Sequence, residues 1–183
     1  MVPNDAHDAH ADAGLTDESL PSPRRVRRIL IAYDGSENAR RAVQHAGKLF
    51  PGARVVVVTA WIGAADTAPE LLLAPGGVIL ATAGAVSDVM RKRAEELCAE
   101  GARFAVDAGL DPVSRAVHSR HATWEGIVRC ADEVDADAII VGARGHAPIV
   151  AALLGSVSTG VVHHSKRPVL VVPEGGELPS ASA

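Results

Sequence analysis

Apolar runs alternate with helical periodicity between residues 28 and 173. Most of these runs contain consecutive Val, Ile or Leu without polar alternation, which is typical of strands that are buried on both faces. The five strand candidates are RILIAY (28–33), RVVVVTAW (54–61), PVSRAV (112–117), DAIIVG (137–142) and PVLVVP (168–173). The third of them is the weaker pattern.

Helical periodicity fills the segments between the runs. The stretch 37–50 predicts a helix whose apolar face is formed by Ala39, Ala42, Val43, Ala46 and Leu49. After a loop at 62–78, a long helix is expected to bury a stripe formed by Val86, Val89, Met90, Leu97 and Phe104. A helix over 123–134 is expected to bury Ile127, Cys130, Ala131 and Val134. A short helix is expected over 156–164.

Strands and helices thus alternate along the whole central part of the chain. This order predicts an α/β fold of the Rossmann-like kind, with an open parallel sheet and helices on both faces. The crossover connections of such a sheet are right-handed. Ligands bind outside the carboxyl ends of the strands, where the strand order reverses, so the residues that follow the strands are the first candidates for a site.

Both ends of the chain differ in composition from its centre. Residues 1–24 are acidic, poor in large apolar residues and rich in Pro, Ser, Ala and Asp, and 175–183 are similarly poor in large apolar residues. We expect two disordered tails around one domain at 25–174.

Composition narrows the classes of function. A net charge of −4 argues against a general nucleic-acid-binding protein, which normally carries a basic surface. No apolar stretch is long enough for a membrane span, and no signal peptide is visible. The two cysteines, Cys98 and Cys130, fall within helical patterns and are expected to be small buried side chains. A reduced, cytoplasmic setting is therefore expected.

The glycines after the fourth strand predict a phosphate site. Gly142 closes the strand, Gly145 follows, and Gly155-Ser156 opens the next helix. A helix N-terminus presents unpaired N–H groups and a partial positive charge, and it binds phosphate when no side chain blocks it. The spacing differs from a Walker A loop, and the position after strand four differs from a dinucleotide fingerprint. The alternative is a glycine-rich turn that binds no ligand.

Two further residues follow strands at the expected site. Asp34 comes after the first strand, where a carboxylate can accept hydrogen bonds from a ribose or help to hold Mg²⁺ near phosphates. Its alternative role is that of a turn or helix-capping residue. Ala60, at the end of the second strand, is small and apolar and suits the wall of a pocket for a flat base.

Three segments resemble the universal stress protein family. They are RRILIAYDGSENARRAV, VVVVTAW and DAIIVGARGHAPIVAALLGSVSTGVVHHSKRPVLVVP, and the resemblance covers about 26–173. The most specific element is G-x2-G-x9-G-S/T. The resemblance implies strand order 3-2-1-4-5 and ATP binding, since members with the full motif tend to bind ATP. One departure is VHSRHATWEG (117–126), which lacks a compact Gly-x-Pro turn seen in many members.

Carried over by position, the resemblance also implies roles for individual residues. Ala32 and Asp34 would lie on the ribose and base side, and Ala60 would offer a backbone contact to adenine. The residues implied along the nucleotide are Val141, Gly142, Arg144 and Gly145, and those implied at the phosphates are Gly155, Ser156 and Val157. The family commonly forms homodimers through the last strand, here 168–173, and an apolar edge strand is a liability unless it pairs.

Three functions remain open on these grounds. The first is an ATP-dependent regulator in stress response with little or no hydrolysis, which acts on an unknown protein partner. The second is a nucleotidyl-transfer or ATP-hydrolysing enzyme of the related adenine nucleotide α-hydrolase superfamily, with His118, His121 and His146 as candidate catalytic groups. The third is a dimeric interaction module with an empty cleft. The side chain of Arg144 would either contact a phosphate or be a solvated surface charge.

Overall fold

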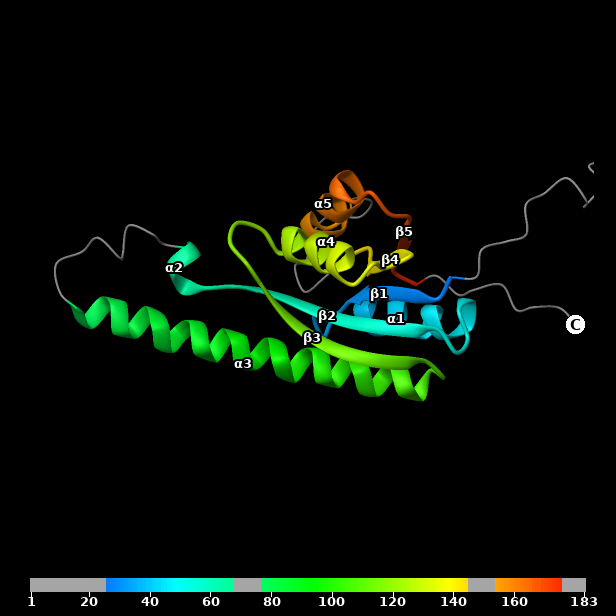
Figure 1. Cartoon of the computed structure of the whole chain (residues 1–183), viewed down its shortest axis with the longest axis horizontal. Helices are drawn as coiled ribbons and strands as arrows, with labels where there is room; N and C mark the ends of the chain where they lie inside the picture. Colours follow the sequence, from blue (N-terminus) through cyan, green and yellow to red (C-terminus); the bar gives the residue numbers. More distant parts are fainter. Residues whose placement is uncertain (1–25, 68–76, 145–153, 176–183) are drawn as a thin grey trace, which may run out of the picture.

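The computed structural model of this chain describes residues 26–67, 77–144 and 154–175. Five strands form a single sheet, and all four pairs of neighbouring strands are parallel. The strands are β1 (Arg28–Ala32), β2 (Arg54–Ile62), β3 (Asp111–Ser119), β4 (Ala138–Gly142) and β5 (Val169–Val172). Their order across the sheet is β3-β2-β1-β4-β5, so the predicted fold class and strand order are confirmed (Figure 1).

Helices cover both faces of this sheet. They are α1 (Glu37–Leu49), α2 (Ala64–Thr67), α3 (Gly77–Asp107), α4 (Thr123–Glu133) and α5 (Ser156–His164). Figure 1 shows α4 and α5 on one side of the strands and α3 on the other. The short helix α2 falls in the segment that was expected to be a loop, and 68–76 of that segment lie outside the described residues, as do 1–25 and 176–183.

The side chains of each strand alternate between two hydrophobic cores. Ile29 and Ile31 of β1 point to the core under α1 and α3, whereas Leu30 points to the core under α4 and α5. Because both cores are hydrophobic, each strand needs apolar residues at consecutive positions, and this explains the unbroken runs in the sequence. Cys98 is buried in the first core and Cys130 in the second, as expected.

The buried face of α3 differs from the predicted stripe. Val86, Val89, Met90 and Phe104 are exposed, and only Leu97 of the predicted set is partly buried. The face toward the protein carries small residues instead: Ala83, Ala94, Cys98, Gly101 and Ala105. The helix lies so close to the sheet that larger side chains do not fit on this side. A Cβ atom at Gly101 would stand 2.7 Å from the ring of Tyr33 and 2.8 Å from Val57.

Smaller differences between the predicted and the observed structure concern the ends of helices and strands. On α1 the predicted Ala39, Ala42, Val43 and Ala46 are buried, but Leu49 in the last turn is 45% exposed because the helix ends at the margin of the sheet. The strand β3, the weakest of the five patterns, runs to Ser119 and pairs with β2 along its full length.

Among the described residues, no helix has both the length and the hydropathy that crossing a bilayer requires.

The close approach of α3 to the sheet gives a matched pair of glycine substitutions. Gly101→Ala is expected to lower the free energy of unfolding by about 1–3 kcal/mol, because the new methyl group overpacks the Tyr33–Val57 contact. Gly84→Ala on the same helix meets nothing within 4 Å and should raise the stability by about 0.5–1 kcal/mol through helix propensity. Urea denaturation followed by circular dichroism measures both, and equal effects would contradict this packing.

Candidate functional site

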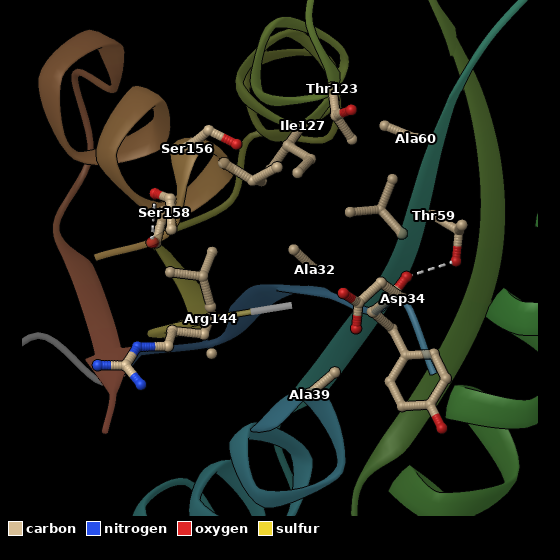
Figure 2. A pocket seen from close by; sticks show the side chains of 16 residues that line it. Ala32, Asp34, Ala39, Thr59, Ala60, Thr123, Ile127, Arg144, Ser156 and Ser158 are labelled. Atoms are coloured by element: carbon tan, nitrogen blue, oxygen red, sulfur yellow. Dashed lines mark hydrogen bonds between the residues drawn. The ribbon is translucent and has the colours of Figure 1, made fainter. Parts of the chain in front are cut away.

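A cavity of about 310 Å³ opens at the carboxyl ends of the central strands. The strand β1 pairs with β2 on one side and with β4 on the other, so the strand order reverses here. Figure 2 shows Ser156 and Ser158 on the α5 side of this cavity and Asp34 and Thr59 on the side of β1 and β2. This cavity lies at the position where the general rule for parallel sheets predicts a ligand site.

Nine of the ten predicted site residues line this one cavity. They are Ala32, Asp34, Ala60, Val141, Gly142, Arg144, Gly155, Ser156 and Val157. The tenth, Gly145, lies outside the described residues, as does His146. The fold thus gathers side chains from three strand ends and from the first turn of α5.

The first turn of α5 forms the polar end of the cavity. Gly155 is its N-cap residue and has no side chain to cap the helix, so helix geometry leaves the first amides without an acceptor inside the helix. The turn is held in place from below, since the Gly155 N–H donates to the Ala143 carbonyl at 2.8 Å and the Ser158 hydroxyl donates to the same oxygen at 2.8 Å. The buried Ser158 therefore has a structural role, and Ser156 is the hydroxyl left at the helix entrance.

The two described glycines of the motif are Gly142 and Gly155, and the physical reason for a glycine differs between the two positions. A Cβ atom at Gly142 would lie 3.0 Å from the backbone of Asn38, so this glycine is needed where α1 packs against the end of β4. A Cβ atom at Gly155 would meet its nearest neighbour, the Ala143 carbonyl oxygen, at an ordinary 3.4 Å. The φ of Gly155, −64°, is also open to any residue. Among the described residues, neither packing nor backbone conformation demands glycine at 155, whereas an approaching ligand would.

Asp34 is a turn residue in this structure, as the alternative interpretation of the sequence predicted. Its Oδ1 accepts a hydrogen bond from the Ser36 N–H at 2.9 Å, across the positive φ of Gly35. Ser36 is the residue that caps α1, because its Oγ accepts from the Ala39 N–H at 3.1 Å. The carboxylate of Asp34 also lines the cavity, so the turn fixes its position at the mouth rather than removing it from the site.

The other walls are mostly apolar, and the sequence did not single out their side chains. The lining residues that were not predicted are Tyr33, Ala39, Val58, Thr59, Thr123, Ile127 and Ser158. Thr59 and Thr123 supply hydroxyls, but the Thr59 hydroxyl already donates to the Tyr33 carbonyl at 2.8 Å. Thr123 begins α4 at the end of the β3 connection, and this position after a strand was the signal available in the sequence.

The basic residue of the cavity has an acidic partner. Arg144 Nη1 lies 2.9 Å from Glu174 Oε2, just beyond β5, and the arginine side chain is 23% exposed. The two expected roles of Arg144, a phosphate contact or a solvated surface charge, stay predictions beside this ion pair. It holds the guanidinium at the edge of the cavity, where Arg144 is one of the lining residues.

The candidate catalytic histidines lie elsewhere in the described part of the chain. His118 and His121 line a separate polar groove between β3 and α4. His118 Nε2 is 2.7 Å from Asp66 Oδ2, and His121 Nδ1 is 3.4 Å from Glu125 Oε2. Neither imidazole therefore reaches the cavity. Within the described residues, no three His, Cys, Asp or Glu side chains gather as a metal site, and the role of Asp34 toward Mg²⁺ stays a prediction.

The helix α5 is positioned by an aromatic contact with α4. The ring of Trp124 stacks on His164 with centroids 4.1 Å apart and an interplanar angle of 11°. A Cβ atom at Gly160 would lie 2.3 Å from Trp124, so the glycine lets the indole pack directly on the α5 backbone. His163 and His164 both lie in the last turn of α5, where positive charge is favoured. The stack fixes the helix whose other end forms the cavity.

A partly buried hydrogen-bond cluster supports the opposite wall. The Tyr33 hydroxyl donates to Glu100 Oε1 at 2.7 Å, and Arg40 Nη2 approaches the same oxygen at 3.2 Å. Burial, followed by the hydrogen bond to Glu100, raises the pKa of Tyr33 to about 12. The hydrogen bonds from Tyr33 and Arg40 hold the pKa of Glu100 below its ordinary value. The cluster ties the end of β1, beside Asp34, to α1 and α3.

The fold and the site together define a doubly wound α/β protein with a cavity at its switch point. The model of the universal stress protein family matches residues 25–173, and the chain belongs to this family. The resemblance seen in the sequence is thereby confirmed.

Individual relatives agree with the family assignment. The chain is 32% identical over 146 residues to a Thermus aquaticus protein, "Universal stress protein in QAH/OAS sulfhydrylase 3'region", which covers 79% of this chain and 96% of that protein. A universal stress protein solved in complex with cAMP is 29% identical, with a TM-score of 0.57, over 81% of this chain and 98% of that one. The Archaeoglobus fulgidus universal stress protein, solved with dAMP, is 25% identical with a TM-score of 0.57, over 81% and 99%.

The Glu100 cluster gives a pH dependence with a definite sign. A carboxyl group whose pKa is lower in the folded chain contributes stability above its unfolded value of 4.5, and this contribution is lost as pH falls through the folded pKa. Acidification should therefore destabilise the wild type more than Glu100→Gln, which keeps an acceptor but cannot titrate. Urea denaturation midpoints between about pH 3 and pH 6 measure the difference.

The matched control is Glu96→Gln on the same helix. Glu96 is exposed and its ion-pair partner, Arg93, lies 3.6 Å away in an i,i+3 arrangement. Such exposed pairs contribute little, so the acid dependence of this variant should follow the wild type. Parallel curves for wild type and Glu100→Gln would contradict the role of the cluster.

Proposed function

We propose that this protein binds ATP in the cavity between β1, β2, β4 and α5 and acts as a nucleotide-dependent regulator in stress response, with little or no hydrolysis. The observation that carries the proposal is the first turn of α5. Among the described residues nothing requires glycine at 155, this N-cap residue has no side chain to cap the helix, and Ser156 and Val157 line the cavity. Relatives that were solved with cAMP and dAMP support an adenine nucleotide as the ligand.

The proposed orientation of the nucleotide follows from the polarity of the walls. The base lies among the apolar residues Ala32 and Ala60, and the ribose lies near the Asp34 carboxylate. The phosphates lie at the entrance of α5, against Gly155, Ser156 and Val157, because amides and the helix dipole favour negative charge there. Val141, Gly142, Arg144 and Gly145 line the nucleotide between these ends, and Asp34 helps to hold any Mg²⁺ that accompanies the phosphates.

The described lining favours binding over turnover. Its only carboxylate is Asp34, which is committed to the turn at Ser36, and its only guanidinium is Arg144, which is paired with Glu174. Rapid phosphoryl transfer relies on groups that position the attacking water and neutralise developing charge. A cytoplasmic regulator whose bound nucleotide is read by a protein partner fits this lining better than a nucleotidyl-transfer enzyme does.

We further propose a homodimer through β5, on an argument from the two open edges of the sheet. On β3 the Asp111 N–H donates to the Ala53 carbonyl, so the next residue, Pro112, faces the open side, where it offers no N–H. On β5 the Val172 carbonyl accepts from Ala143, so Val171 faces the open side with a complete peptide group. The strand β5 (Val169–Val172) itself contains no proline, although Pro173 follows it, and its open edge is the one that we propose for pairing with another chain.

Nucleotide binding is tested directly by acid extraction of the purified protein, by calorimetric titration with ATP and by product analysis after incubation with ATP and Mg²⁺. Bound, unchanged ATP is the expected result. An AMP or adenylated product would establish the enzyme instead, and the absence of binding at millimolar ATP would establish an empty cleft.

The variant Gly155→Val separates binding from folding. The φ at 155 is open to any residue and a Cβ there meets the described residues at no less than 3.4 Å. The valine side chain should cover the amides of α5, so ATP affinity should fall at least about tenfold, or about 1.4 kcal/mol. The unfolding midpoint should stay close to the wild type. Gly155→Ala is the graded control and should have an intermediate affinity. Wild-type affinity in Gly155→Val would exclude phosphate binding at this helix entrance.

The dimer is tested by the pair Val171→Pro and Val171→Ala. Proline removes the N–H that faces the open edge, whereas alanine keeps it, so only the proline variant is expected to sediment as a monomer. Sedimentation velocity over a range of concentrations measures this, with circular dichroism as the check on folding. A dimer that persists in Val171→Pro would contradict pairing through β5.

A further inference from the structure

Arg144 and Glu174 stand at matching positions beyond two neighbouring strands. In the register of β4 and β5, Gly142 pairs with Val172, and each of the two charged residues follows its strand by two positions. The Ala143 N–H donates to the Val172 carbonyl at 2.8 Å, so the two segments stay together beyond Gly142. Arg144 Nη1 and Glu174 Oε2 consequently meet at 2.9 Å.

The backbone of Arg144 lies directly at the entrance of α5. A Cβ atom at Gly155, the N-cap residue, would stand only 3.5 Å from the Arg144 Cα. The side chain itself is directed elsewhere, since Figure 2 shows its guanidinium turned away from Ser156 and Asp34. The cation that starts beside the proposed phosphate position is thus paired with Glu174, an acidic residue that is not part of the cavity lining.

A carboxylate and a phosphate compete for the same arginine. The planar guanidinium fork matches either group, and it forms charge-assisted hydrogen bonds with both. The side chain of Glu174 is 62% exposed, and an ion pair with a partner this exposed contributes little to stability. A triphosphate therefore displaces the carboxylate from Arg144, but its affinity is reduced by the ion pair that it has to break.

We propose that Glu174 is a positioning residue that lowers the affinity for the nucleotide by holding Arg144 away from the phosphates. The inference rests on the proposed binding of ATP in this cavity. When the nucleotide binds, the Arg144 guanidinium exchanges the Glu174 carboxylate for a phosphate oxygen. Residue 174 thereby sets the nucleotide concentration at which the site fills.

The charge-neutral variant Glu174→Gln tests this exchange by calorimetric titration with ATP. Glutamine has the same size but no charge to retain the arginine, so the Kd for ATP should fall about three- to tenfold. The matched control is Glu133→Gln, which removes one negative charge from another arginine ion pair, Glu133 to Arg115 at 2.7 Å, outside the cavity. This control should keep the wild-type Kd within about twofold, because it changes only the net charge.

A double-mutant cycle with Arg144→Gln tests whether Glu174 acts through the arginine. Arg144→Gln alone should weaken ATP binding. Adding Glu174→Gln to it should change the Kd less than about twofold, because no guanidinium remains to be released. In the chain that keeps Arg144, the gain from Glu174→Gln should also be larger for ATP than for AMP, which carries fewer phosphate charges. A merely structural role would change the affinity for both ligands alike.

Equal Kd values for Glu174→Gln and Glu133→Gln would overturn the proposal, as would a gain of the same size with and without Arg144. Both results leave the proposed function standing, because the wild type binds ATP in those experiments. Failure of the wild type itself to bind ATP would instead contradict the proposed function, and this inference with it. Unfolding midpoints of all variants are the check on folding.

Discussion

The amides in the first turn of α5 have no acceptors within the helix, and the candidate site is arranged around this deficit. In most helices a serine, threonine or aspartate at the N-cap position supplies an acceptor, as Ser36 does for α1. At α5 the N-cap residue is Gly155, which supplies none. Because a parallel sheet brings the carboxyl ends of its strands to one edge, this uncapped turn faces the same cavity as Asp34 and Ala60.

An uncapped helix end needs rigid support if it is to present its amides at a fixed position. Three contacts supply it here. The Ala143 carbonyl accepts hydrogen bonds from both the Gly155 N–H and the Ser158 hydroxyl. In the middle of α5, Gly160 admits the Trp124 indole against the helix backbone. The glycines and serines of this segment therefore divide between support of the helix and access to it, and only Gly155 and Ser156 remain for access.

The sequence predicted the strands and the location of the site because both depend on local patterns. Unbroken apolar runs identify buried strands, and residues directly after them lie at the site edge. The buried face of α3 could not be predicted in this way. Its contact uses Ala94 and Cys98, whereas the larger Val89 and Met90 give the stronger apolar signal and lie outside. The Tyr33–Glu100 hydrogen bond joins residues 67 positions apart, and no local pattern reports such a contact.

The proposed attraction between the site and a triphosphate is necessarily short in range. The chain carries a net charge of −4, so its overall field repels an anion rather than steering it inward. The only basic side chain of the described lining, Arg144, is compensated by Glu174. What remains is the set of oriented amides at α5, which act over the length of a hydrogen bond. Long-range electrostatic attraction does not draw the nucleotide into a site of this kind, so its occupancy follows the nucleotide concentration. A sensor of nucleotide level requires this behaviour.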